Sequence, residues 1–197
     1  MVWLLAIVVI FVLVIGAVVY LLADRRATAK REDVDVDSLL DNLGRLEALE
    51  STGLMDAPRR ADFDELTREA AGRLHAPMAF MSLVDDHRQF FASEFGRPDG
   101  LPRETGLDYS YCKHVVAGET PFKVTDSEVD LRVKDNLGTT EGGVRSYLGV
   151  PLRTSDGHVI GSFCVADSSA REWDEGSRAE LELLAAKAMT LAARRSE

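Results

Sequence analysis

The sequence predicts an α+β fold, in which an antiparallel sheet carries its helices on one face, preceded by one N-terminal transmembrane helix. Three observations lead to this prediction. An uncharged apolar run occupies residues 2–22, strand-like segments from residue 78 onward form two hairpins, and helical periodicity occurs before, between and after them. The expected order is helix, helix, hairpin, short helix, strand, long loop, hairpin and long helix.

The N-terminal apolar run has the length of a membrane span. Val2 to Leu22 is about 21 residues, and at about 1.5 Å per residue a helix of this length matches the thickness of a bilayer core. Trp3 and Tyr20 lie near its two ends, as is typical of side chains at the membrane interface. A cleaved secretory signal would need a basic residue before the run and a small-residue cleavage site after it, and neither is found. We therefore expect a retained transmembrane anchor at residues 1–23.

Basic residues after the run set the expected orientation. Four of them follow it closely: Arg25, Arg26, Lys30 and Arg31. Because positive charge favours the cytoplasmic side, we expect a single-pass protein of the cell membrane whose soluble domain is cytoplasmic. The charged stretch at 24–37 is typical of a juxtamembrane linker, and residues 38–197 are long enough for one domain.

Charge and cysteine content exclude some classes of function. The net charge of −10 lies wholly after Ala23, which argues against binding to a phosphate backbone, so no nucleic-acid partner is expected. Cys112 and Cys164 belong to the part placed in the reducing cytoplasm. A structural disulfide between them is therefore not expected, and small buried thiols are the simpler interpretation.

Three segments have helical periodicity. The first follows Ser38 as N-cap, ends at Gly53, and has leucines at three- and four-residue intervals: Leu39, Leu40, Leu43, Leu46 and Leu49. A second helix is expected between Pro58 and Pro77, with Asp62 as its cap. A long helix is expected over residues 173–195, with an apolar stripe that suits either a core or a partner.

Between these helices the pattern changes to that of strands and loops. The run at 78–84 and the segment at 88–96 predict one hairpin, and the segments at 144–153 and 159–167, joined through Asp156-Gly157, predict a second. A short helix over 111–117 and a strand over 122–125 are expected between the hairpins. We expect loops at 97–104 and 126–143, the second with at most a helical turn near Leu131.

Four segments carry a more specific signal: LEALESTGLMDAP, FDELTREAAGRLHAPMAFMSLVDDHRQFFASEFG, YCKHVVAGETPFKVTD and YLGVPLRTSDGHVIGSFCVAD. In this order and with these gaps they resemble a bacterial GAF domain over about residues 43–191. The resemblance implies a six-stranded antiparallel sheet with helices behind it, and a pocket between the sheet and the loops or short helices on its other side. GAF domains act as small-molecule sensors or dimerisation modules. Their ligands include cyclic nucleotides, linear tetrapyrroles and haem, and some have none, so the cofactor stays unknown.

Cys112 and His114 invite the sharpest chemical hypotheses. Tetrapyrrole-binding GAF domains attach their chromophore through a cysteine next to a histidine, but here Lys113 intervenes, so an inert thiol is expected. The scattered histidines do not favour haem, and two isolated cysteines do not supply a zinc site. The cysteine segments also differ from those of GAF proteins that reduce free methionine sulfoxide. We predict no catalytic residues, no metal site and no enzyme.

The remaining side chains with donors, acceptors or aromatic surface predict a ligand site in segments expected to converge. They are Tyr109, Tyr111, Cys112, His114, Asp126 and Arg145. The leading hypothesis is a membrane-anchored sensor that binds a small molecule or a protein and signals without catalysis. Because the sequence ends at Glu197, we expect the signal to reach a homodimer partner or a separate signalling protein. The alternatives are a ligand-free dimerisation scaffold and a thiol-dependent enzyme.

Overall fold

The computed structural model describes residues 36–97 and 100–194, which belong to a compact unit, Val36–Glu197. A separate unit, Met1–Asp35, contains the predicted membrane helix at 2–22 and most of the predicted linker, and both lie outside the described residues. Within the described ranges, no helix combines the length and the apolar character that a membrane span requires.

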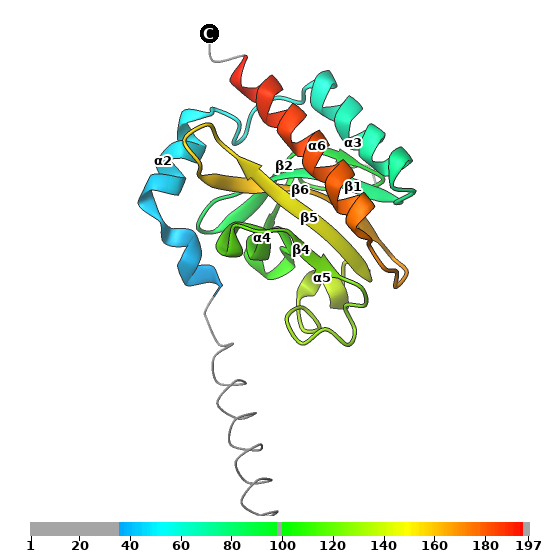
Figure 1. The fold of residues 1–197 in the computed structure, drawn as a ribbon. Helices are drawn as coiled ribbons and strands as arrows, with labels where there is room; N and C mark the ends of the chain where they lie inside the picture. Colours follow the sequence, from blue (N-terminus) through cyan, green and yellow to red (C-terminus); the bar gives the residue numbers. More distant parts are fainter. Residues whose placement is uncertain (1–35, 98–99, 195–197) are drawn as a thin grey trace, which may run out of the picture. The chain divides into compact units, whose positions relative to one another are not determined.

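The centre of the unit is a six-stranded antiparallel sheet with the strand order β3-β2-β1-β6-β5-β4 (Figure 1). The strands are β1 Met78–Val84, β2 Arg88–Phe95, β3 Glu104–Gly106, β4 Phe122–Val124, β5 Ser146–Arg153 and β6 Val159–Asp167. Both predicted hairpins, β1–β2 and β5–β6, are confirmed. They join through β1 and β6, with Met81 opposite Phe163, so that the first hairpin binds the second at the middle of the sheet.

Two long helices cover one face of the sheet, α3 (Ala61–Arg73) and α6 (Glu175–Ala193), and we call it the α6 face (Figure 1). Its core takes alternate residues of the central strands, because successive side chains of a strand point to opposite faces. The buried strand residues on this face include Ala79, Met81, Leu83, Leu148, Val150, Leu152, Phe163 and Val165. Helix α2 (Leu43–Ser51) adds Ala48 and Leu49 to the same core.

The opposite face of the sheet is covered by α4 (Cys112–Gly118) and the 3-10 helix η1 (Asp37–Asp41), and we call it the α4 face. Leu40 of η1 and Val115 of α4 are fully buried there. The order of elements alone predicted helices on one face, which is correct for α3 and α6 but not for α4. The resemblance had implied short helices on the other side of the sheet, and α4 lies there. The physical reason is that β6 is buried on both faces over nearly its whole length, so each face needs a cover.

The first predicted helix is divided at Asn42. The side chain of Asn42 caps α2 by accepting a hydrogen bond from the Arg45 N–H, and the residues before it form η1, so Ser38 is not the N-cap of a continuous helix. Buried Arg45 donates hydrogen bonds to the backbone carbonyls of Leu40 and Val84, which ties η1, α2 and β1 together. Leu43 of the predicted apolar stripe is 75 % exposed.

Other boundaries differ from the prediction in smaller ways. Asp62 lies in the first turn of α3, where its carboxylate accepts the Phe63 N–H, rather than at the cap. The predicted loop after β2 ends in the short edge strand β3. In the loop at 126–143, the N–H of Lys134 donates to the carbonyl of Asp130, as the expected helical turn requires, and a second short helix, α5 (Leu137–Thr140), is capped by Asn136. Three-residue strands and four-residue helices are too short for periodicity to reveal.

Candidate functional site

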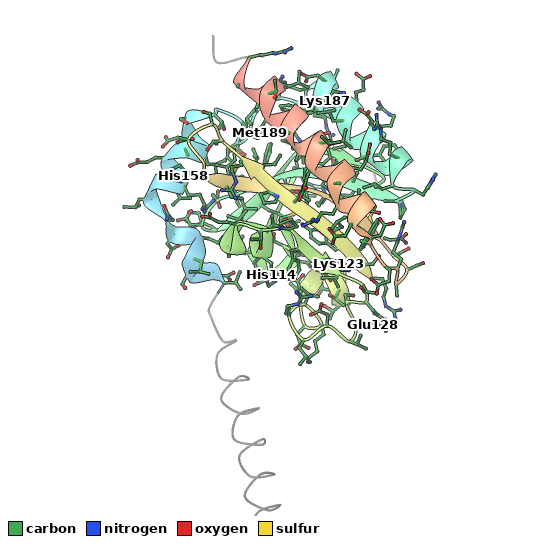
Figure 2. All side chains as sticks on the ribbon, in the orientation of Figure 1. His114, Lys123, Glu128, His158, Lys187 and Met189 are labelled. Atoms are coloured by element: carbon green, nitrogen blue, oxygen red, sulfur yellow. The ribbon has the colours of Figure 1, made fainter. Side chains whose placement is uncertain are left out.

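Four of the six predicted ligand residues lie in consecutive turns on the α4 face. Tyr109 ends the 3-10 helix η2 (Leu107–Tyr109), Tyr111 is the N-cap residue of α4, and Cys112 and His114 lie in the first turn of this helix. The turn between them is fixed by Ser110, whose hydroxyl oxygen accepts a hydrogen bond from the backbone of α4. Figure 2 shows His114 on this helix, on the opposite side of the molecule from Lys187 and Met189 of α6.

The two tyrosines connect this segment to α5. Tyr109 donates a hydrogen bond from its hydroxyl to the carboxylate of Glu141, which raises the pKa of Tyr109. The hydroxyl of Tyr111 pairs with that of Thr139, and the Tyr111 ring packs on Tyr147 with 5.3 Å between ring centroids. Tyr111 is only 4 % exposed, and burial raises its pKa. These side chains attach α5 to the segment that precedes α4.

Beneath α4 lies a buried cluster of thiols and hydroxyls. The Sγ atoms of Cys112 and Cys164 are 3.8 Å apart, and both cysteines are free thiols. Tyr147 donates a hydrogen bond of 3.4 Å to the sulfur of Cys112, and its oxygen lies 3.1 Å from the hydroxyl of Ser162. Contact with Cys164 and the Tyr147 hydroxyl lowers the pKa of Cys112 to about 7, whereas burial raises the pKa of Cys164 well above its ordinary value.

His114 lies at the edge of the same cluster. Its ring stacks on Phe122 of β4 with 4.6 Å between centroids and 15° between planes. The guanidinium of Arg132 lies over the Phe122 ring, 4.5 Å from its centroid. Burial, with the positive charges of Lys113 and Arg132, lowers the pKa of His114 to about 4. His114 is therefore neutral at pH 7 and contributes an aromatic surface rather than a charge.

Asp126 and Arg145 pair with each other rather than with the α4 segment. The Nε of Arg145 donates to the Asp126 carboxylate at 2.8 Å, and Glu128 adds a second carboxylate at 3.1 Å. The pair lowers the pKa of Asp126. Next to it, buried Ser127 donates its hydroxyl to the carbonyl of Val144, so the pair anchors the start and the end of the loop at 126–143.

The structure thus divides the predicted residues into two groups, the α4 segment and the loop anchor. Sequence reasoning missed the residues that link them to the sheet and to α5: Thr139, Glu141, Tyr147, Ser162 and Cys164 as a partner of Cys112. The alternation in the last hairpin did place Tyr147 on the opposite face from Leu148. Its partners depended on the register of β5 and β6, in which Gly149 faces Cys164 and leaves room for the Tyr147 hydroxyl.

A surface groove of about 810 Å³ lies elsewhere, between the end of α2, the β5–β6 turn and the C-terminal half of α6. A smaller groove of about 500 Å³ continues along α2 toward Arg60. Of the six predicted ligand residues, all within the described ranges, none lines either groove. Across the residues that the structure describes, no group of three or more His, Cys, Asp or Glu side chains is arranged to hold a metal ion.

Comparison with known proteins identifies the family to which the fold belongs. The sequence profile described as "GAF domain" matches residues 58–194, which is more than half of the chain. A cyclic di-GMP phosphodiesterase of Pseudomonas aeruginosa is 31% identical over 132 residues, covering 66% of this chain and 22% of the relative. A diguanylate cyclase of Escherichia coli is 32% identical over 78 residues, covering 40% of this chain and 22% of the relative. The chain therefore matches about a fifth of the length of these two relatives.

Solved structures agree on the architecture. The GAF domain of an Acinetobacter phosphoenolpyruvate-protein phosphotransferase superposes with a TM-score of 0.58 at 18% identity, over 77% of this chain and 92% of that one. At this identity the likeness concerns the fold alone. Together with the six-stranded sheet and the α4 face, the matching profile identifies the chain as a member of the GAF domain family.

Proposed function

We propose that the chain is a membrane-anchored, non-catalytic regulatory domain that binds a small molecule on its α4 face and acts in cyclic di-GMP signalling. The connection to this second messenger comes from the names of the two relatives, whose matched segments are a fifth of their length. The anchor is residues 2–22, with the described unit on the cytoplasmic side. The output reaches a second copy or a separate signalling protein.

The observation that carries the proposal is the way in which α5 is attached. Across the described residues, side-chain hydrogen bonds from Tyr109 to Glu141, from Tyr111 to Thr139 and from Asn136 to the carbonyl of Ser110 connect α5 to the segment before α4. Side-chain hydrogen bonds contribute only about 1 kcal/mol between neutral groups and about 1.5–3 kcal/mol to a carboxylate such as that of Glu141, so a ligand with matching polar groups can replace them. Aromatic rings and hydroxyls would then line the opened space, as small-molecule sites require.

The first experiment is native mass spectrometry, with absorbance spectra, on the full chain purified in detergent from a bacterial cytoplasmic membrane without added ligand. A co-purifying mass is expected, and it identifies the ligand class. The variant Tyr111→Phe removes one hydroxyl from the proposed site and is expected to lower ligand occupancy. Lys187→Ala on α6 is the matched control, because Lys187 lies on the opposite face of the sheet.

A scaffold without ligand is the second candidate function, and a specific observation favours it. Tyr111 is 4 % exposed, Tyr147 is 3 % exposed and Cys164 is 1 % exposed, so side chains already fill the centre of the α4 face. A ligand-free mass that stays unchanged when bacterial small-molecule extract is added would favour this scaffold over the sensor. A dimer mass in the same measurement would support a homodimeric scaffold.

Catalysis is the third class, with Cys112 as the residue to test. We propose no catalytic role, because the thiol lies under α4 and is 4 % exposed, which excludes a substrate larger than a small oxidant such as peroxide. Any turnover that the purified chain supports should therefore be unchanged in Cys112→Ser. Loss of turnover in this variant, with an unchanged unfolding temperature, would instead favour a thiol-dependent enzyme.

A further inference from the structure

The buried pair Cys112 and Cys164 points to a modification site that the proposed function does not use. We infer that these two thiols form a reversible disulfide under peroxide, which joins α4 to the central strand β6. The sulfurs are 3.8 Å apart although the residues are 52 positions apart in sequence. Both thiols are free, and the chain contains no other cysteine, so an intramolecular disulfide must join these two.

The geometry requires only a small movement. A disulfide bond is about 2.05 Å long, so the sulfurs must approach each other by about 1.8 Å. Strand β6 is fixed because it pairs with β1 on one side and β5 on the other. Helix α4 has seven residues, ends at Gly118 and is followed by Glu119, whose backbone has a positive φ of 52°. The short helix is therefore the element that moves toward the sheet.

The surroundings of the pair distinguish the two thiols. Tyr147 donates its hydroxyl hydrogen to Cys112, and a hydrogen bond to sulfur stabilises a thiolate. Cys164 is 1 % exposed and lies deeper, on the sheet itself. Cys112 is thus the attacking sulfur and Cys164 the resolving sulfur. The lowered pKa of Cys112, about 7, agrees with this order.

The reaction balances with hydrogen peroxide as the oxidant. The Cys112 thiolate attacks one peroxide oxygen, the O–O bond breaks, and a sulfenic acid and hydroxide form, the hydroxide taking up the proton that the thiol lost. The Cys164 sulfur then attacks the Cys112 sulfur, the S–O bond breaks, and the Cys164 proton leaves with the hydroxyl group as a second water. Two electrons pass from the dithiol to the peroxide, and a dithiol reductant reverses the change.

The disulfide would act on the N-terminal side of the unit. Lys113, which follows Cys112, forms an ion pair with Asp37 of η1 at 2.9 Å. Leu40 of η1 shares the buried cluster of the α4 face with Cys112. Moving the start of α4 toward β6 therefore changes the packing of η1, the first described element of the chain. Formation of the bond does not depend on the proposed ligand.

The test treats the full chain with hydrogen peroxide, denatures it, alkylates free thiols and measures the intact mass. The expected product is two hydrogen atoms lighter than the untreated chain, carries no alkyl group, and regains two alkylation sites after dithiothreitol. Peptide mapping of the native sequence, without any substitution, should recover the two cysteine-containing peptides as one disulfide-linked species. The inference would be overturned if the folded chain kept two alkylatable thiols under peroxide conditions that oxidise the urea-unfolded chain completely. It would also be overturned if disulfides formed only between chains.

Variants then test the assigned roles. In Cys164→Ser, Cys112 should stop at the sulfenic acid, which a sulfenic-acid probe labels, and Cys112→Ser should give no labelled product. Tyr147→Phe keeps the ring but removes the hydrogen bond to the Cys112 sulfur. A rise of about one in the pKa of Cys112 would lower the thiolate fraction at pH 7 about fivefold, and because the remaining thiolate is a stronger nucleophile, oxidation would slow about twofold. Tyr109→Phe is the matched control, because its hydroxyl contacts Glu141 instead. Equal oxidation rates in the two tyrosine variants would refute the role of Tyr147.

Discussion

Protonation of His114 should destabilise the domain between about pH 6.5 and pH 4. Burial and two nearby cations lower the pKa of His114 from its ordinary value of 6.5 to about 4 in the folded chain. In this window the unfolded chain binds a proton that the folded chain does not bind. The stability that neutral His114 contributes is therefore complete above pH 6.5 and is lost as the pH falls through 4.

The size of the effect follows from the two pKa values. The difference between 6.5 and about 4 corresponds to about 3 kcal/mol of unfolding free energy at 25 °C, and the partly accessible edge of the ring reduces this to about 2–3 kcal/mol. Carboxylates such as Asp130, whose pKa is lowered by Arg132, also lose stabilisation in acid. The comparison must therefore be with a variant that lacks only the imidazole.

His114→Phe is that variant, since a phenyl ring keeps the stack on Phe122. Urea unfolding of the unit Val36–Glu197, followed by circular dichroism between about pH 7.5 and pH 4, gives the free energy for both proteins. The difference in unfolding free energy between the variant and the native protein should shift in favour of the variant by about 2–3 kcal/mol when the pH is lowered from about 7.5 to about 4. Parallel curves for native and His114→Phe proteins would refute the reasoning.

Three further predictions concern the fold and use the same unfolding measurement. Arg45→Met leaves two buried carbonyls without a donor and should lower the unfolding free energy by about 2–4 kcal/mol. The control Arg178→Met loses only surface ion pairs on α6 and should lower it by less than about 1 kcal/mol. Equal losses would contradict the stabilising role of the Arg45 hydrogen bonds. Gly161→Ala should destabilise by about 1–3 kcal/mol because a Cβ would lie 2.1 Å from the backbone of β1, while Gly72→Ala in α3, where the space is open, should stabilise by about 0.5–1 kcal/mol. Leu152→Ala should cost about 2–5 kcal/mol, and a loss below about 1 kcal/mol would mean that the α6 face is not packed as described.

Much of the fold followed from local patterns. Apolar runs of strand length predicted β1, β5 and β6, and the Asp156-Gly157 turn predicted the pairing of the last two, because a residue with positive φ is needed there and Gly157 has φ 97°. The break at Asn42 and the strand β3 were missed. A leucine repeat cannot reveal a capping side chain that stops it, and a three-residue strand depends on the neighbour with which it pairs.

The candidate site was predictable only as a set of segments. Sequence reasoning selected Tyr109, Tyr111, Cys112, His114, Asp126 and Arg145 because they combine aromatic, polar and charged groups in segments expected to converge. It could not reveal that Cys112 meets a cysteine 52 positions away. That contact depends on the register of β6 and on the placement of α4, which are long-range features.

The sequence by itself determined the family, the order of the principal helices and strands, and which faces of them are apolar, because periodicity and turn residues act over a few positions. Only the tertiary structure decided that the two hairpins join at the middle of the sheet through pairing of β1 with β6, and which helices cover each face. It also decided the chemistry beneath α4. Hydrogen bonds, burial and neighbouring charges change the properties of Cys112, Tyr147 and His114, and these arise only when distant segments are packed together.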